Sequence, residues 1–434
     1  MPWELLVWCV SVVLFLALLT QRYWESRLPF WLRGMRDSPL RWYLIGYPLA
    51  VCRIRFTWRR LCQNVDLSVM RRSRYTAVSR DTMVRGTPIR PIPPRLGLIR
   101  PTLLGFTVRV HLHPGQTPAQ FLGNADAFVH AWRVHAVRII STKRGEVSMI
   151  ATHRDPLADS AAAWNAFPAP RLMTAVVGRL ADGAAWVMDF LAVPHWLITG
   201  ATQSGKSTLV ASLVTALGAQ PVAILGIDLK GGMELGLFEK RLSGLATSRA
   251  EAIILLRQVI DDLGRRMDIC RADGVRSIWE LDENDRPVPV IIVVDEVAEL
   301  YLAADPAGKK EAVECSTLLL RTAQLGAALG VHLVIAAQRF GSDLGPGATA
   351  LRAQLGGRIC HRVTDETTAE MTLGDLFPDA VIVAQAIGEH EKGVAVTTVG
   401  GQWTRARSTL VTPDQARQHS AATSDRMALG DWNE

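Results

Sequence analysis

The chain lacks paired cysteines. Six cysteines are scattered over its 434 residues, and no two of them form a C-x-x-C pair. They are Cys9, Cys52, Cys62, Cys270, Cys315 and Cys360. This absence argues against a structural zinc site and against a disulfide framework, and it fits a reducing cytoplasm.

Lysine is missing from residues 22–100, and acidic residues are scarce there. This region holds 17 arginines against four acidic residues, so its balance is +13 and the rest of the chain sums to −6. The basic character therefore belongs to the N-terminal region, and the overall charge is no argument for DNA binding by the remainder. We predict that the arginines of this region that follow Cys52 contact anionic lipid. DNA contact, or a leader without a specific partner, are the alternatives.

No positive residue precedes the first long apolar run, Leu5 to Leu19. Its fifteen residues span only about 22 Å, but the stretch from Pro2 to Tyr23, with aromatic residues near its ends, is long enough for a core of about 30 Å. Arginines follow the run, which is the wrong order for a cleaved signal peptide and places the bulk of the chain in the cytoplasm. We expect residues 1–60 to anchor the protein in the cytoplasmic membrane, with a transmembrane helix at about 3–23.

A second apolar stretch, Trp42 to Cys52, is short and contains Gly46 and Pro48. We expect it to be interfacial or re-entrant, because a second crossing would carry the rest of the chain outside the cell. Residues 61–101 are rich in arginine and proline and predict a stiff linker. Alternating strand patterns around a helical stretch at 117–132 then predict a small α+β module over residues 102–192.

The residues from Gly200 to Ser207 fit G-x-x-x-x-G-K-[ST], the loop that holds the phosphates of a nucleotide. An apolar strand leads into the loop and a helix leaves it. Lys206 should reach the β- and γ-phosphates of ATP, and Ser207 should give its hydroxyl to Mg²⁺. The residues expected to bind ATP are Gly200, Ala201, Thr202, Gln203, Ser204, Gly205, Lys206, Ser207 and Thr208.

Two more apolar strands end in polar residues suited to ATP hydrolysis. The strand at 288–294 is followed by Asp295 and Glu296. Asp295 is the candidate for the Mg²⁺ side, and Glu296 is the candidate general base. The strand at 331–337 is followed by Gln338, which could sense the γ-phosphate. Strands that alternate with helices over residues 193–412 predict a doubly wound, mainly parallel α/β sheet, followed by a short tail at 413–434.

In these motifs the sequence resembles the FtsK/SpoIIIE family of membrane-anchored DNA translocases, including the transfer proteins of actinobacterial conjugative elements. The motifs, in the family's order, are Gly200 to Ser207, Ile227 to Lys230, Met233 to Leu235, Arg265 to Met267, Val294 to Leu300 and Gly330 to Arg339. The segments Leu112 to Thr117 and Arg154 to Leu157 are similar to those that precede the motor in the actinobacterial members.

The resemblance implies a RecA-like P-loop ATPase that forms a hexameric ring around double-stranded DNA. It also implies an arginine finger from a neighbouring subunit, for which Arg358 and Arg321 are candidates. Gln203 stands where the family commonly has glycine, and we expect the loop to require no glycine there. About twenty residues follow Pro413, too few for the family's winged-helix module. We also expect no four-helix membrane domain in the N-terminal region.

These departures favour conjugative transfer of a plasmid or integrative element as the function. The alternatives are a chromosome-segregation pump of the same family, an ATPase of the same fold that drives protein secretion, and a membrane scaffold that uses ATP only to assemble.

Overall fold

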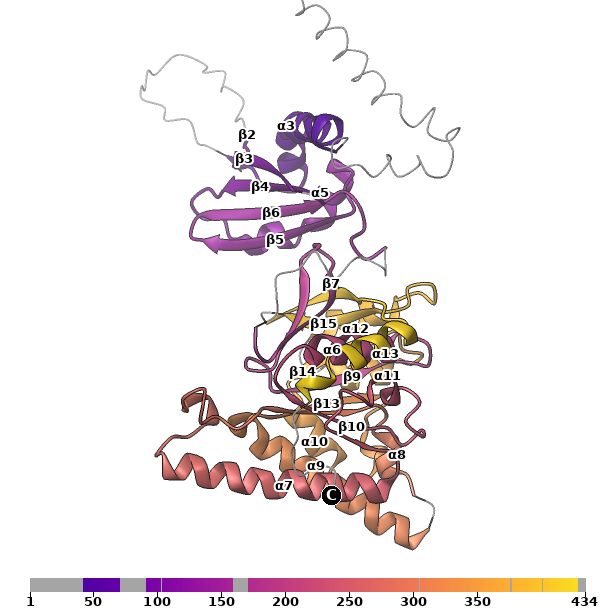
Figure 1. The fold of residues 1–434 in the computed structure, drawn as a ribbon. Coiled ribbons are helices and arrows are strands. Elements are labelled where there is room, and N and C mark those ends of the chain that lie inside the picture. Colours follow the sequence, from indigo (N-terminus) through magenta and orange to yellow (C-terminus); the bar gives the residue numbers. More distant parts are fainter. Residues whose placement is uncertain are drawn as a thin grey trace, which may run out of the picture. The chain divides into compact units, whose positions relative to one another are not determined.

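The chain folds into two compact units, residues 1–156 and residues 157–434 (Figure 1). The computed structural model describes residues 42–70, 91–102, 104–158, 171–303, 305–374, 377–399 and 401–427. The predicted transmembrane helix at 3–23 lies outside these ranges. Within them, no helix has both the length and the apolar character needed to cross a bilayer.

The N-terminal unit is an antiparallel sheet with helices against one face. Its strands lie in the order β3-β4-β6-β5. Its elements are η3 (Trp42–Gly46), α3 (Tyr47–Asn64), β1 (Val69–Met70), β2 (Pro91–Ile92), β3 (Arg95–Thr102), β4 (Gly105–His111), α4 (Pro118–Leu122), α5 (Ala125–Trp132), β5 (Ala136–Lys143) and β6 (Glu146–Thr152). Alternate residues of the central strands are buried against the helices, as the two-residue period of a strand requires.

The stretch from Trp42 to Cys52 is built into this unit. The indole of Trp42 stacks on His153 with ring centroids 4.0 Å apart, and its Nε1 donates to the carbonyl of Thr102 over 2.9 Å. Ala50 is buried in the core. One side of this stretch therefore packs against protein, which contradicts the re-entrant form of the expectation. The interfacial form stays a prediction.

Part of the predicted linker is a strand. Residues 95–102 form β3, which pairs with β4 at the edge of the sheet. Pro101 lies opposite Phe106 in this pairing. An edge strand tolerates proline because the missing N–H group can lie on the unpaired side. The boundary expected at residue 102 is corrected accordingly, since the unit also includes α3.

The C-terminal unit is built on one ten-stranded sheet, in the order β11-β10-β12-β13-β9-β14-β15-β16-β7-β8. The first six strands of this order are parallel, and the remainder pair antiparallel. The strands are β7 (Thr174–Leu180), β8 (Ala185–Asp189), β9 (His195–Thr199), β10 (Ala223–Ile227), β11 (Gly244–Ala246), β12 (Val290–Val294), β13 (Val331–Ala337), β14 (Gly357–His361), β15 (Val394–Val399) and β16 (Gln402–Ser408). The predicted mixed α/β fold with a large, mainly parallel sheet is confirmed.

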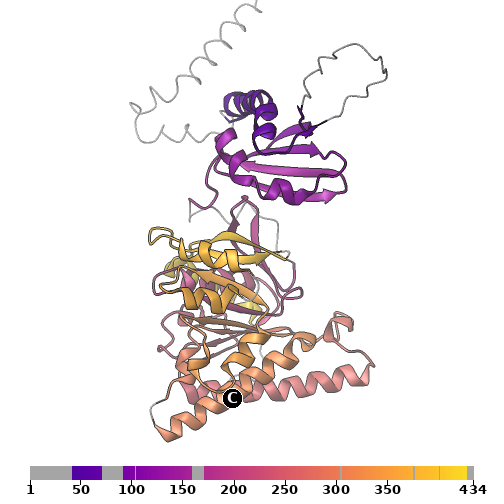
Figure 2. The ribbon, with the colours of Figure 1, turned by 180° about the vertical axis from the view of Figure 1, so that it is seen from behind.

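Helices cover both faces of this sheet. On one face lie α6 and α13, and on the other lie α7, α9 and α10, with α7 and α9 side by side (Figure 2). The helices are α6 (Lys206–Gly218), α7 (Arg249–Ala272), α8 (Ala298–Tyr301), α9 (Pro306–Gly326), α10 (Ala348–Gln354), α11 (Glu366–Ala369), α12 (Pro378–Gln385) and α13 (Pro413–Ala422). Short helical turns are η5 (Leu235–Phe238), η6 (Ile278–Glu280), η7 (Ala327–Leu329), η8 (Ser342–Leu344), η9 (Glu370–Gly374) and η10 (Ser424–Arg426).

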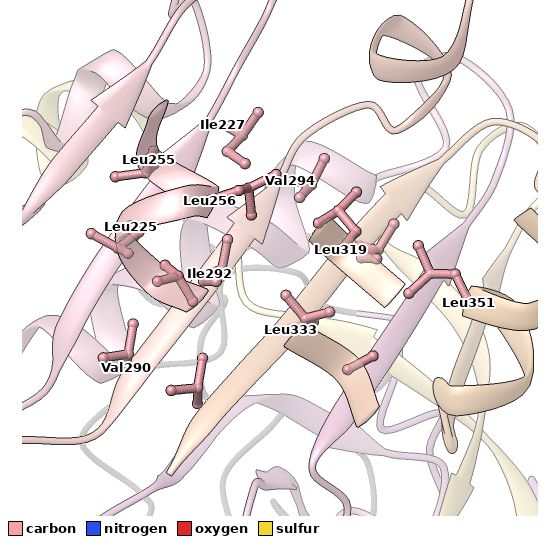
Figure 3. Packing of buried hydrophobic residues seen from close by; sticks show 14 of the residues in the cluster. Leu225, Ile227, Leu255, Leu256, Val290, Ile292, Val294, Leu319, Leu333 and Leu351 are labelled. Carbon is pink, nitrogen blue, oxygen red and sulfur yellow. The ribbon is translucent and has the colours of Figure 1, made fainter. Parts of the chain in front are cut away.

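The parallel strands are apolar on both sides, as two-sided cover demands. Figure 3 shows Leu225, Ile292 and Leu333, one from each of three neighbouring strands, packed with Leu256 and Leu319 of the helices α7 and α9. The alternate strand residues, such as Ile291 and Val334, belong to the second cluster beneath α6.

Two domain boundaries of the C-terminal part also differ from expectation. The sequence pattern assigns the hairpin of β7 and β8 to the middle module, but β7 pairs with β16 of the large sheet. Residues 413–422, expected to be a tail, instead form α13, which packs against α6 and η5. Local sequence gives no sign of either placement, because both depend on partners more than 150 residues away along the chain.

Candidate nucleotide-binding site

The phosphate loop connects β9 to α6 at the carboxyl edge of the parallel strands. Gly200 has φ +156° and Gly205 has φ +113°, values that side-chain-bearing residues rarely adopt. A Cβ at Gly205 would lie 2.4 Å from the main-chain nitrogen of Gly393. That nitrogen also donates to the carbonyl of Ser204 over 2.9 Å. The turn before β15 therefore supports the phosphate loop from outside.

Gln203 has φ +61°, which lies in the left-handed region. This conformation favours glycine, but the chain adopts it with glutamine, so the loop does not require glycine at this position. An L-residue other than glycine costs about 1–2 kcal/mol there, because its Cβ crowds the following carbonyl. Glycine, the residue common in the family at this position, adopts a positive φ without strain. In this chain Gln203 adopts the same conformation with strain in its backbone.

Lys206 begins α6 and folds back over the loop. Its ammonium donates a hydrogen bond to the carbonyl of Gly200. Burial lowers the pKa of Lys206, while the nearby carboxylates of Glu296 and Asp295 raise it and Lys230 lowers it. Ser207 and Thr208 occupy the same first turn, where free N–H groups favour an anion.

Asp295 and Glu296 follow β12 and are both largely buried, with exposed fractions of 8% and 7%. The main-chain N–H of Gln338 donates to Oε1 of Glu296 over 3.2 Å. Among the described residues Oε2 of Glu296 has no hydrogen-bond partner. Burial, followed by the charge of Asp228, raises the pKa of Asp295 to about 6.

Lys230 is a site residue that the prediction from sequence did not single out. Its Nζ lies 3.8 Å from Oδ2 of Asp295 and 3.8 Å from Oε2 of Glu296. The loop that carries it is shaped by Asp228, whose buried carboxylate accepts from the N–H groups of Glu234 and Leu235. The signal was available, since Lys230 follows β10, and β10 pairs with β12. The carboxyl ends of neighbouring parallel strands must lie together.

These groups line one cavity of about 470 Å³. Its walls are Ala201, Thr202, Gln203, Gly205, Lys206, Ser207, Thr208, Lys230, Met233, Glu234, Asp295, Glu296, Gln338 and Lys392. A second cavity of about 510 Å³ also touches Ala201, Thr202 and Gln338, and it extends to Arg339 and Arg362. Of the predicted loop residues, Gly200 and Ser204 do not line the first cavity, and both are buried.

The two arginine-finger candidates lie outside this cavity. The guanidinium of Arg358, on β14, is largely buried and donates to the carbonyl of Arg352 over 2.9 Å. This contact ties Arg358 into its own subunit. Arg321 lies on α9 with an exposed side chain.

The donor set fits Mg²⁺. A hydroxyl from Ser207 and a carboxylate from Asp295 line the same cavity, and both offer the oxygen atoms that this ion prefers. Oε2 of Glu296 is a further acceptor beside them. In the described part of the chain, no group of three or more histidine, cysteine or acidic side chains has the arrangement needed to hold a metal ion by itself.

The comparisons with known proteins agree with these motifs. Residues 31–153 match the actinomycete conjugal transfer protein N-terminal domain, and residues 158–286 and 279–342 match the FtsK/SpoIIIE family. The chain is 40% identical to the transfer protein TraSA of Streptomyces ambofaciens over 354 residues, which cover 78% of this chain and 85% of that protein.

Two more distant similarities concern the motor. The chain is 28% identical to the DNA translocase FtsK of Staphylococcus aureus over 227 residues, which cover 48% of this chain and 28% of that protein. The solved structure of the pCW3 conjugation coupling protein TcpA, in its monomer form with ATPgS, has a TM-score of 0.53 and 20% identity. The match covers 76% of this chain and 93% of that chain, and at this identity it supports the fold alone.

Proposed function

The chain belongs to the FtsK/SpoIIIE family, among the actinomycete conjugal transfer proteins. On this premise we propose that it is an ATPase that moves double-stranded DNA during conjugative transfer. The observation that carries the proposal is the meeting of five groups at one sheet edge. The phosphate loop, Lys230, Asp295, Glu296 and Gln338 follow β9, β10, β12 and β13 and line one cavity.

The strand order supports a RecA-like arrangement of the sheet. β13 lies between the loop strand β9 and the carboxylate strand β12. Gln338, at the end of β13, therefore lies between the phosphate loop and Glu296. A polar side chain at that position is well placed to report whether the γ-phosphate is present.

Each residue has a distinct role in hydrolysis. The loop N–H groups and the start of α6 hold the phosphates, and Lys206 neutralises charge on the β- and γ-phosphates. Ser207 and Asp295 would hold Mg²⁺, and the ion would supply charge neutralisation at the phosphates. Glu296, oriented by the N–H of Gln338, accepts the proton of the attacking water. Lys230 offsets the charge of the two adjacent carboxylates.

The motor works as a hexameric ring with DNA in the pore, as the family resemblance implies. An arginine from a neighbouring subunit would complete the site. Arg321 suits this role better than Arg358, because its side chain is exposed whereas Arg358 is bound within its own subunit.

The protein is held at the cytoplasmic membrane by the apolar stretch at 3–23 and by the outer side of α3. That side of the helix exposes Leu49 by 56% and Phe56 by 82%, with Arg55, Arg59 and Arg60 beside them. The opposite side, including Ile54, packs into the core. An apolar strip flanked by arginines matches the boundary of an anionic bilayer.

The test is DNA-stimulated ATPase activity of the full chain at low salt. A truncated chain beginning near residue 90 would lose α3 and open the core of the N-terminal unit, so the full chain is required. Glu296→Gln should bind ATP normally and lose turnover by about 10²-fold or more. Glu299→Gln, at an exposed acidic residue nearby, is the matched control and should keep full activity. Hydrolysis stimulated by protein but not by DNA would select a secretion motor instead.

A further inference from the structure

The sheet of the N-terminal unit has one face that its helices do not cover. In the pairing of β3, β4, β6 and β5, Phe106, Val108 and Met149 point to the helices and are fully buried. Most of their sequence neighbours point the other way and are half-buried or exposed. This outward face comprises Arg95, Arg100, Thr102, Gly105, Thr107, Arg109, His111, Ala136, Arg138, Ile140, Lys143, Glu146, Ser148, Ile150 and Thr152.

The outward face is basic. Arginine or lysine occurs on three of its four strands, and Arg95, Arg100 and Arg109 have exposed side chains. Glu146 is the one acidic residue in the sequences of the four strands. Its carboxylate already lies 3.4 Å from His111 and 3.9 Å from Lys143. The face therefore carries a net positive charge.

The face is also largely polar. Between the arginines lie Thr107 and Ser148, short side chains that let a ligand approach the sheet closely. Ile140 and Ile150 are half-buried. A bilayer would favour projecting apolar groups such as Phe56 on α3, whereas a phosphate backbone favours short hydroxyl groups and arginines. The outward face thus fits nucleic acid better than lipid.

The spacing of the arginines suits a duplex. Arg100 and Arg138 lie in the same row, joined through Thr107 and Ile150. Three strand spacings separate them, or about 14 Å. Arginine side chains spread over this distance can contact several phosphates of one duplex.

The division of charge between the two units also favours DNA binding by the N-terminal unit. Residues 1–156 contain 23 basic and 8 acidic residues, a balance of +15, and residues 157–434 contain 25 and 33, a balance of −8. Double-stranded DNA carries about one negative charge per 1.7 Å. Long-range attraction of DNA must therefore come from the N-terminal unit.

We propose that the outward face of the β3-β4-β6-β5 sheet binds the phosphate backbone of double-stranded DNA, giving the motor a second contact to its substrate. This inference rests on the proposed function, that of a DNA motor. It assigns the sheet face to DNA and leaves the outer side of α3 to the membrane.

The test compares two triple variants of the full chain. Arg95→Gln, Arg100→Gln and Arg109→Gln together remove three charges from the sheet face. Arg55→Gln, Arg59→Gln and Arg60→Gln remove three from the outer side of α3 in the same unit and serve as the matched control. Fluorescence anisotropy with a labelled duplex is measured over a range of salt concentrations, and thermal unfolding checks that both variants are folded.

The sheet-face variant should bind the duplex about tenfold or more weakly, and the slope of log K against log salt should become shallower by about 3. In the control variant, the affinity for the duplex and the salt slope should both change less than in the sheet-face variant. The ATPase rate without DNA should equal that of wild type in both variants. Equal DNA binding by wild type and the sheet-face variant overturns the inference. So does a sheet-face variant that loses binding to anionic vesicles while keeping its affinity for DNA.

The two levels of failure are distinguishable. If DNA does not stimulate wild-type ATPase activity at all, the proposed function fails. If DNA stimulates both wild type and the sheet-face variant with the same half-maximal concentration, only the assignment of this face fails.

Discussion

The main-chain N–H of Gln338 holds the carboxylate of Glu296 through a hydrogen bond of 3.2 Å. The bond crosses from the end of β13 to the end of β12, two strands that pair in parallel. Because the donor is the main chain, the position of Glu296 does not depend on which side chain residue 338 carries. The side chain of Gln338 is left available for the cavity that it lines.

Replacing Gln338 by alanine should therefore separate binding from turnover. We expect Gln338→Ala to bind ATP with nearly unchanged affinity and to lose about 10- to 100-fold in kcat, because only an interaction made in the transition state is removed. Isothermal titration calorimetry and steady-state ATPase assays measure the two quantities. Gln354→Ala, at an exposed position, is the control. A parallel loss of affinity and turnover would show that the side chain binds ATP in the ground state.

Gly205 should not tolerate even a methyl group. In Gly205→Ala the new Cβ would lie 2.4 Å from the nitrogen and 2.5 Å from the Cα of Gly393, both main-chain atoms that cannot move aside easily. We expect loss of detectable ATP binding in a chain that still folds. Gly236→Ala is the control, since a Cβ there meets nothing within 4 Å. Wild-type affinity in Gly205→Ala would mean that the loop and the turn at Gly393 separate readily.

The left-handed backbone of Gln203 gives a pair of opposite substitutions. Gln203→Gly should keep or raise the free energy of unfolding, by up to about 1 kcal/mol, because glycine adopts a positive φ without strain. Gln203→Val should lower it by about 1–2 kcal/mol and weaken ATP binding, since a β-branched residue is disfavoured at this φ. Urea denaturation measures both. Equal stabilities for the glycine and valine variants would contradict the conformation described for the loop.

His195 and His332 should make the motor unit sensitive to acid. Burial lowers the pKa of His195 to about 4 and that of His332 to about 3, below the usual value of 6.5. Between these pKa values and 6.5, both histidines are protonated in the unfolded chain but not in the folded one. Their contribution to the free energy of unfolding is therefore present above pH 6.5 and is lost as the pH falls toward 4. Each histidine contributes a slope of about 1.4 kcal/mol per pH unit.

Urea denaturation between about pH 7.5 and pH 5 tests this sign. His332→Asn removes one titrating group. The free energy of unfolding should then fall less steeply with decreasing pH, by about the 1.4 kcal/mol per pH unit that one histidine contributes. His130→Asn, on α5 of the other unit, is the control and should leave the slope for the motor unit unchanged. A decline that is the same with and without His332 would exclude this histidine as a cause.

The sequence predicted the elements of the motor well wherever local patterns decide them. The strand at 331–337 has the bounds that were expected, and α7 begins at a local sequence pattern, the capping box of Ser248 and Glu251. The strand, loop and helix around Lys206 also follow the pattern. These features rest on residues within a few positions of one another, so their conformation is encoded locally.

The sequence by itself therefore determined that this chain has a phosphate loop, buried strands with polar ends, and a basic N-terminal region. Only the tertiary structure decided that Lys230 joins Asp295 and Glu296, that Gln203 has a left-handed backbone, and that Trp42 packs on His153. Strand order and packing bring these groups together, and both depend on the burial of apolar surface between segments far apart in the chain.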